Sequence, residues 1–276
     1  MLAYAHKILD KTLGIRETSA CMTRLFESLA GISPVHLTAE PELSLSESEI
    51  LLMLESIKKL SQHIPLQHIL GKTEFCNLTF QISDKVLIPR METEELVYLI
   101  LQRENRSNLR VIDLGTGSGC IAISLKKHLP FPSHVVAADL SSEALDIART
   151  NARLLDAEII FLETDILSDS FVLQETFDLI VSNPPYVCDS EKKLMLPQVK
   201  DHEPSCALFV PDASPLLYYH AIAHFASKHL SPKGRVFVEI NERFGQETML
   251  CFSKRGFQTC LHQDLFNKDR FVEAWW

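Results

Sequence analysis

The stretch Arg110-Val111-Ile112-Asp113-Leu114-Gly115-Thr116-Gly117-Ser118-Gly119-Cys120 decides the fold of this chain. An apolar strand, 110–114, runs directly into three glycines at alternate positions, and a helix is predicted from Cys120. Glycine lets the backbone turn sharply and approach a ligand closely, and doubly wound α/β sheets bind nucleotide-like ligands at this kind of turn. The alternative is a tight strand-to-helix turn that binds no ligand. Two glycines would favour that alternative, whereas three at alternate positions disfavour it.

Around this loop the sequence alternates between apolar strands and amphipathic helices, as in a parallel sheet. The pattern predicts seven strands, at Arg110–Leu114, His134–Asp139, Ile159–Glu163, Phe177–Ser182, Val236–Ile240, Phe257–His262 and Phe271–Trp275. Helices are predicted at Glu92–Leu101, Cys120–Leu129, Ser142–Leu155, Pro215–His229 (with Ser214 as its N-cap) and Gln246–Lys254. No helix separates the last two strands, so they should pair antiparallel. The expected fold class is therefore α/β, with a Rossmann-like seven-stranded sheet.

The N-terminal part is predicted to form a small helical domain over residues 1–64. Ser46-Glu47-Ser48-Glu49 is a capping box, and the residues after it are apolar at helical spacing. A second amphipathic helix is expected over Glu17–Leu29. In residues 65–84 apolar Leu78, Phe80 and Ile82 alternate with polar residues, which predicts a β-hairpin that joins the helical domain to the sheet domain, 85–276.

Composition narrows the class of protein. The chain has 276 residues, 46% of them hydrophobic, and a net charge of −9, which disfavours a protein that binds nucleic acid by neutralising phosphates. The seven cysteines are odd in number and include no C-x-x-C pair, which favours free thiols over disulfides or a zinc site. We expect no signal peptide, and the sequence contains no apolar run of about 20 residues. We expect a cytoplasmic protein without a metal and without a membrane partner.

Charge indicates which ligand the glycine loop would hold. The loop departs from the dinucleotide pattern G-x-G-x-x-G, and Asp113 at its entrance would repel phosphate but attract the sulfonium and ammonium groups of S-adenosylmethionine. Asp139 ends the second strand, where an acidic residue binds ribose hydroxyls in such folds. Asp165 follows the third strand and would lie at the adenine edge, with Ile166 packed beside the ring. Any one of these aspartates could instead cap a helix.

The fourth predicted strand runs into Asn183-Pro184-Pro185-Tyr186. As structure alone, this is a rigid turn. As chemistry, the Asn183 side-chain oxygen and the Pro184 carbonyl could accept both N–H bonds of a planar amide or aromatic amine and aim its nitrogen at a methyl group. Tyr186 would pack on the flat face of that acceptor group. Such a site needs no strong base, because the nitrogen becomes acidic once it is methylated.

Together these motifs resemble those of the bacterial and organellar peptide chain release factor glutamine methyltransferases. The segments that carry the resemblance are Pro65–Gly71 with Glu74-Phe75, Val86–Glu94, Asp113–Ala122, Asn183–Tyr186 and His202–Pro204 with Ala207-Leu208. The Asn-Pro-Pro-Tyr element is shared with DNA adenine methyltransferases, whereas Ile88–Glu94 is more specific. The chain departs from the family pattern at Val210–Pro215 and Ile240–Gly245, and the roles of Arg90 and Glu92 stay open.

The resemblance implies a Rossmann-like S-adenosylmethionine-dependent methyltransferase domain with a small helical domain that grips the substrate. The methyl group would go to the side-chain nitrogen, N5, of the glutamine in the Gly-Gly-Gln loop of class 1 release factors. The residues expected to contact the cofactor are Asp113, Leu114, Gly115, Thr116, Gly117, Asp139, Asp165, Ile166 and Asn183. Those expected to hold the glutamine are Asn183, Pro184, Pro185 and Tyr186, with Asn183, Pro184 and Tyr186 catalytic.

Two other functions stay open at this point. A DNA or RNA amino-group methyltransferase could use the same tetrapeptide, but it would flip a base into the pocket and need a basic groove. Residues 1–84 carry a charge of −3 (7 basic and 10 acidic side chains) and do not offer such a groove. A cofactor-binding interaction module without catalytic activity is the second alternative, which the intact Asn183–Tyr186 disfavours.

Overall fold

The computed structural model describes residues 1–39, 44–131, 133–168 and 171–276, and these divide into two compact units. The helical unit contains Met1–Lys72 and Leu196–His202, and the sheet unit contains Thr73–Met195 and Glu203–Trp276. In the described ranges, no helix has both the length and the apolar character that a membrane span requires.

The helical unit is held together by one apolar core. Its helices are α1 (Leu2–Leu9), α2 (Ile15–Ala30), α3 (Pro34–Ala39), α4 (Glu47–Ser61), α5 (Leu66–Leu70) and α9 (Pro197–Lys200). Leu9, Met22, Leu25, Met53 and Ile57 are buried in this core. The predicted capping box starts α4: Ser46 Oγ accepts the Glu49 N–H, and the Ser46 N–H donates to Glu49 Oε2 at 2.7 Å.

The sheet unit is built on the predicted seven-stranded sheet. Its strands are β3 (Leu109–Leu114), β4 (Ser133–Asp139), β5 (Ile160–Glu163), β6 (Phe177–Ser182), β9 (Leu230–Glu239), β10 (Gln258–Gln263) and β11 (Asp269–Trp275). They lie in the order β10-β11-β9-β6-β3-β4-β5, with only β11 antiparallel to its neighbours. The α/β fold class is therefore confirmed, as is the antiparallel pairing of the last two strands.

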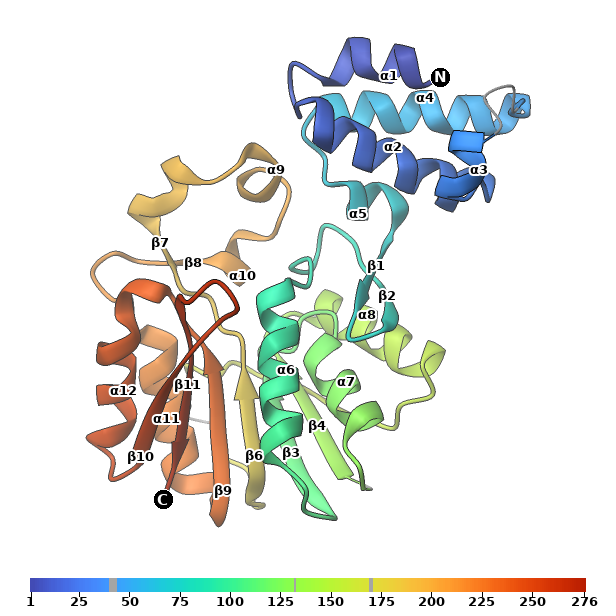
Figure 1. The fold of residues 1–276 in the computed structure, drawn as a ribbon. Helices are drawn as coiled ribbons and strands as arrows, with labels where there is room; N and C mark the ends of the chain where they lie inside the picture. The colour runs from blue at the N-terminus through green and yellow to red at the C-terminus, as the bar shows by residue number, and fades with distance from the viewer. Residues whose placement is uncertain (40–43, 132, 169–170) are drawn as a thin grey trace. The chain divides into compact units, whose positions relative to one another are not determined.

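Helices cover both faces of this sheet (Figure 1). Helices α6 (Met91–Arg103), α7 (Cys120–His128) and α8 (Ser142–Leu154) lie on one face, and α11 (Leu217–His229) and α12 (Gly245–Ser253) lie on the other. Alternate residues of a strand serve the two faces: Val111 packs with Leu96 and Ile121, whereas Ile112 packs in the cluster that holds α11. The central strands are buried on both faces, as parallel strands between helical layers must be.

The predicted hairpin is present as β1 (Lys72–Phe75) and β2 (Leu78–Gln81). Cys76 and Asn77 join the strands, and both have the positive φ that a tight two-residue turn requires. Asn151 of α8 anchors the second strand: its Oδ1 accepts the Gln81 N–H at 2.7 Å and its Nδ2 donates to the Gln81 carbonyl at 2.9 Å.

The structure corrects two element boundaries. The helix expected from Pro215 begins at Leu217, and its N-cap is Leu216 and not Ser214. Ser214 lies in the preceding turn, where its N–H donates to the Pro211 carbonyl. Strand β9 begins at Leu230, six residues before the expected Val236. The strand runs through Pro232 and Gly234 with an irregular register beside β6.

The segment after β6 contains short elements that periodicity did not predict. They are β7 (Val187–Cys188), the 3₁₀ helix Asp189–Leu194, α10 (Ser205–Leu208) and β8 (Phe209–Val210). Strands β7 and β8 pair in parallel as a separate two-stranded sheet. A further 3₁₀ turn, Glu242–Phe244, follows β9.

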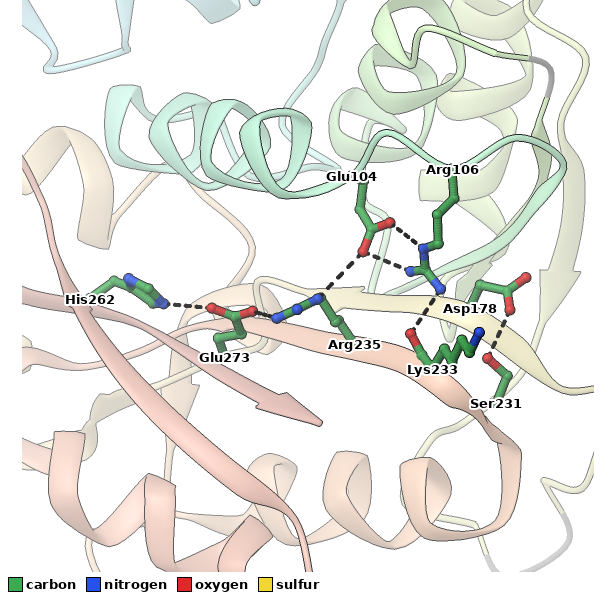
Figure 2. Close-up of polar contacts among 8 residues, drawn as sticks. All are labelled: Glu104, Arg106, Asp178, Ser231, Lys233, Arg235, His262 and Glu273. Atoms are coloured by element: carbon green, nitrogen blue, oxygen red, sulfur yellow. Dashed lines mark hydrogen bonds and ion pairs between the residues drawn. The ribbon is translucent and has the colours of Figure 1, made fainter. Parts of the chain in front are cut away.

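Buried carboxylates tie α6 to the sheet through arginines (Figure 2). Glu104 accepts two hydrogen bonds from Arg106, at 2.8 and 2.7 Å, and lies 3.8 Å from Arg235. Arg235 also pairs with Glu273, which in turn bonds His262 at 2.9 Å. Burial raises the pKa of Glu273, but His262 and Arg235 outweigh it, so its pKa is lowered. This network joins three strands and one helix.

Arg235→Met should lower the free energy of unfolding by about 3 kcal/mol, because it removes the cation between two buried carboxylates. Arg149→Met is the control, since Arg149 pairs at the surface with exposed Asp146 and should cost about 1 kcal/mol or less. Urea titrations measure both values. Equal losses in the two variants would show that the network does not stabilise the sheet.

Candidate active site

A cavity of about 180 Å³ lies at the carboxyl ends of β3, β4 and β6, where ligands bind in open α/β sheets. The predicted site residues that line it are Leu114, Gly115, Thr116, Gly117, Asp139, Asp165, Ile166, Asn183, Pro184 and Pro185. The two motifs, which are about 70 positions apart in the sequence, therefore form one cavity. Residues that were not among the predicted site residues, including Pro89, Thr93, Cys206 and Tyr218, complete its lining, and the first two belong to the segment Val86–Glu94 that carries the family resemblance.

The backbone N–H groups of the glycine loop donate hydrogen bonds to other parts of the protein. The N–H groups of Gly115 and Thr116 both donate to the Ala138 carbonyl, at 2.8 and 3.0 Å, and the Gly117 N–H donates to Asp139 Oδ2 at 2.8 Å. A loop that binds phosphate would instead leave such amides free for the anion. This loop cannot offer them, which agrees with the charge argument against a dinucleotide.

Asp139 and Asp165 both line the cavity, and they differ in how many backbone N–H groups their carboxylates accept. Asp139 accepts two backbone N–H groups, from Gly117 and from Ser141 at 2.9 Å. Burial raises its pKa, and these N–H donors partly offset that rise. Asp165 accepts one N–H, from Leu167 at 2.8 Å. Each carboxylate oxygen has a second lone pair, so both residues can still accept from a ligand hydroxyl or amine.

Asp113 and Tyr186 lie outside the cavity lining, unlike the other predicted site residues. Asp113 is fully buried, and its Oδ2 accepts the Thr116 hydroxyl at 2.6 Å. Burial raises its pKa to about 7. The structure shows Asp113 supporting the loop through Thr116, and its direct contact with the ligand stays a prediction. The Tyr186 hydroxyl donates to Glu239 Oε1 at 3.0 Å, and burial raises its pKa well above the ordinary value.

Asn183 is held from behind by a chain of hydrogen bonds. Its Nδ2 donates to Thr93 Oγ1 at 3.0 Å, and the Thr93 hydroxyl donates to Glu239 Oε2 at 2.7 Å. The sequence analysis did not assign Thr93 or Glu239 to the site, although Thr93 lies in the segment Ile88–Glu94 that it singled out. Glu239 ends strand β9, so the rule that picked out the aspartates at strand ends could have found it.

Glu203 braces two walls of the cavity. It is buried, accepts the Ile88 N–H at 3.1 Å, and pairs with Arg90 at 2.6 Å. Pro89 and Pro204, the neighbours of these residues, both line the cavity. Arg90 therefore supports the cavity wall, whereas neither it nor Glu92 lines the cavity itself.

The arrangement fits a ribose-bearing cationic ligand beside a planar N–H donor. Two aspartates line the cavity, the loop amides are occupied, and apolar Leu114, Ile166 and Pro184 provide flat packing surfaces. S-adenosylmethionine has this chemistry. Within the residues that the structure describes, no group of three or more His, Cys, Asp or Glu side chains is placed to hold a metal ion.

Comparisons with known proteins agree with this geometry. The family model "Methyltransferase small domain" matches residues 75–199, and the model "PrmC N-terminal domain" matches residues 1–71. The chain is 41% identical to the release factor glutamine methyltransferase of Flavobacterium psychrophilum, over 91% of this chain and 89% of that protein. It is 39% identical to the enzyme of the same name from Bacteroides thetaiotaomicron, over 99% and 98%.

A solved structure shows the same fold. The crystal structure of a methyltransferase from Pyrococcus furiosus matches with a TM-score of 0.53 and 16% identity, over 83% of this chain and 98% of that chain.

Asp139→Asn should weaken S-adenosylmethionine binding by about 10- to 100-fold, because an amide can accept only one of the two N–H groups that Asp139 holds. Asp165→Asn is the control: its oxygen can keep the single bond to Leu167, so the loss should be smaller. Isothermal titration calorimetry measures both affinities. Unchanged binding in the Asp139 variant would show that its two backbone hydrogen bonds do not shape the ligand site.

Proposed function

Since the chain belongs to the release factor glutamine methyltransferase family, we propose that it transfers a methyl group from S-adenosylmethionine to N5 of the glutamine in the Gly-Gly-Gln loop of class 1 release factors. The observation that supports this most strongly is the placement of Asn183 and Pro184 in the same cavity as the glycine loop and Asp139. That cavity joins a place for the methyl donor to a pair of acceptors for an amide –NH₂ group.

The proposed reaction depends on orientation more than on acid–base chemistry. S-adenosylmethionine, when bound, supplies an electrophilic methyl group. Asn183 Oδ1 and the Pro184 carbonyl oxygen accept the two N–H bonds of the substrate amide and hold its nitrogen toward the donor. Proline fixes φ, so the Pro184 carbonyl is oriented at little cost in entropy. Transfer of the methyl group would break its bond to sulfur and leave S-adenosylhomocysteine, and the methylated nitrogen would then lose a proton to water.

We also propose that the helical unit binds the release factor. Helix α4 exposes Leu51 and Leu52, at 67% and 46%, which is unusual for a surface without a partner. As domains we propose residues 1–64 for recognition, 65–84 for the hairpin linker and 85–276 for catalysis. All seven cysteines are free, in keeping with a proposed location in the cytoplasm.

Methylation of an amino group of a nucleic acid is the less favoured function. The tetrapeptide alone would suit it, but the relatives that match nearly the whole chain are named for release factors. The net charge of −9 also gives no electrostatic attraction to a polyanion.

The test supplies a labelled methyl donor with an intact release factor, with a variant in which the glutamine of the Gly-Gly-Gln loop is alanine, and with DNA. Label should appear on the intact release factor alone. Label on DNA, or equal label on both release factors, would contradict the proposal.

Asn183→Ala should reduce methyl transfer by about 10²–10³-fold, since one hydrogen bond made in the transition state is removed. Asn105→Ala is the matched control, because Asn105 is exposed and lies outside the cavity, and it should leave the rate unchanged. Initial rates on the release factor measure both. A normal rate for the Asn183 variant would refute its role.

A further inference from the structure

Glu239 is a buried carboxylate held by hydroxyl groups instead of a cation. Of the buried glutamates in the described ranges, Glu104, Glu203 and Glu273 each pair with an arginine. Glu239 is equally buried, yet its partners are the hydroxyls of Thr93 and Tyr186, and it forms no ion pair with any of the described residues. An ionised carboxylate without a cation is costly to bury, and such costs are typical of functional sites.

The direction of the hydrogen bonds around Glu239 determines how Asn183 is turned. An ionised carboxylate only accepts, so the single proton of the Thr93 hydroxyl goes to Glu239 Oε2, at 2.7 Å. Thr93 Oγ1 can then only accept from Asn183, and it is the Nδ2 group of Asn183 that must face it, at 3.0 Å. Asn183 Oδ1 faces away, and none of the described residues donates a hydrogen bond to it.

We propose that Glu239, acting through Thr93, is a positioning residue that holds the Asn183 amide with its oxygen toward the methyl acceptor. This inference rests on the proposed function and deepens it. With the amide turned over, Asn183 would present N–H groups to the N–H groups of the substrate glutamine. We call the chain of hydrogen bonds from Glu239 through Thr93 to Asn183 the relay. It favours a substrate that donates N–H groups, such as a primary amide, and disfavours the reversed orientation of the Asn183 amide.

Protonation of Glu239 should reverse the relay. Burial raises the pKa of Glu239 to about 7, although Thr93, Tyr186 and Arg270 lower it. The other groups that face it are Glu92, which raises its pKa, and Tyr219, whose hydroxyl donates to the Glu239 backbone carbonyl at 3.2 Å. A protonated carboxyl can donate to Thr93, whose own proton then turns to Asn183 and favours the flipped amide. The ionised form is the active one, so kcat should fall as pH falls through about 7.

Thr93→Val removes the hydroxyl and keeps the shape of the side chain. It should lower kcat by about 10- to 100-fold, while KM for the release factor and the affinity for S-adenosylmethionine change by about twofold or less. Thr93→Ser restores the hydroxyl and should recover most of the rate. Thr248→Val is the matched control, because Thr248 is fully buried and its hydroxyl has no hydrogen-bond partner in the described structure. Equal kcat in the Thr93→Val and Thr248→Val variants would overturn the proposal.

Glu239→Gln tests the relay by its pH profile. The variant should lower kcat and lose the inflection near pH 7 that is expected for the wild type. Burial also raises the pKa of Asp113 to about 7, so Asp113→Asn serves as the comparison and should keep the inflection. A Glu239→Gln variant with the wild-type profile would overturn the assignment.

A readout without substrate separates this inference from the proposed function. In protein with ¹⁵N-labelled asparagine, the side-chain amide of Asn183, identified by its loss in Asn183→Ala, should be protected from hydrogen exchange and lose that protection in Thr93→Val. If this holds and no release factor is methylated, the proposed function fails and the relay stands. If methylation occurs and the amide is equally protected in both proteins, the relay fails.

Discussion

A hydrogen bond of 2.6 Å from Ser182 Oγ to the Leu114 carbonyl oxygen joins the ends of strands β6 and β3, and both halves of the site depend on it. The glycine loop begins directly after Leu114, and Asn183 directly follows Ser182. Neighbouring parallel strands in fixed register place these two residues at the same edge of the sheet. The position of the glycine loop relative to Asn183 is thereby set by the sheet and not by a flexible loop.

The protein treats its buried carboxylates in two ways. Glu104 and Glu273 lie away from the cavity and are neutralised by arginines, and Arg235 of β9 thereby joins the end of helix α6 to strand β11 (Figure 2). Glu239, behind the cavity, is left to hydroxyl donors and keeps a pKa near 7. The first arrangement serves stability, and the second provides a directional set of hydrogen bonds next to Asn183.

The sequence predicted the sheet, the glycine loop and Asn183–Tyr186 because each leaves a local pattern: an apolar run, glycines at alternate positions, a strand followed by two prolines. It could not show that the Asp113 carboxylate is buried, because burial depends on tertiary packing. The bond between Thr93 and Glu239 joins residues 146 positions apart, so no local pattern could show it, although the position of Glu239 at a strand end was itself detectable. The short elements between 187 and 210 have no periodicity to detect, since each contains only two to six residues.

The most direct test is the structure of the protein bound to S-adenosylhomocysteine and a peptide that contains Gly-Gly-Gln, at a pH above 7. The glutamine nitrogen should lie about 3 Å from both Asn183 Oδ1 and the Pro184 carbonyl oxygen, with Asn183 Nδ2 still bonded to Thr93. A glutamine bound elsewhere, or held by the Nδ2 side of Asn183, would contradict the assignment of this cavity as an amide-methylating site.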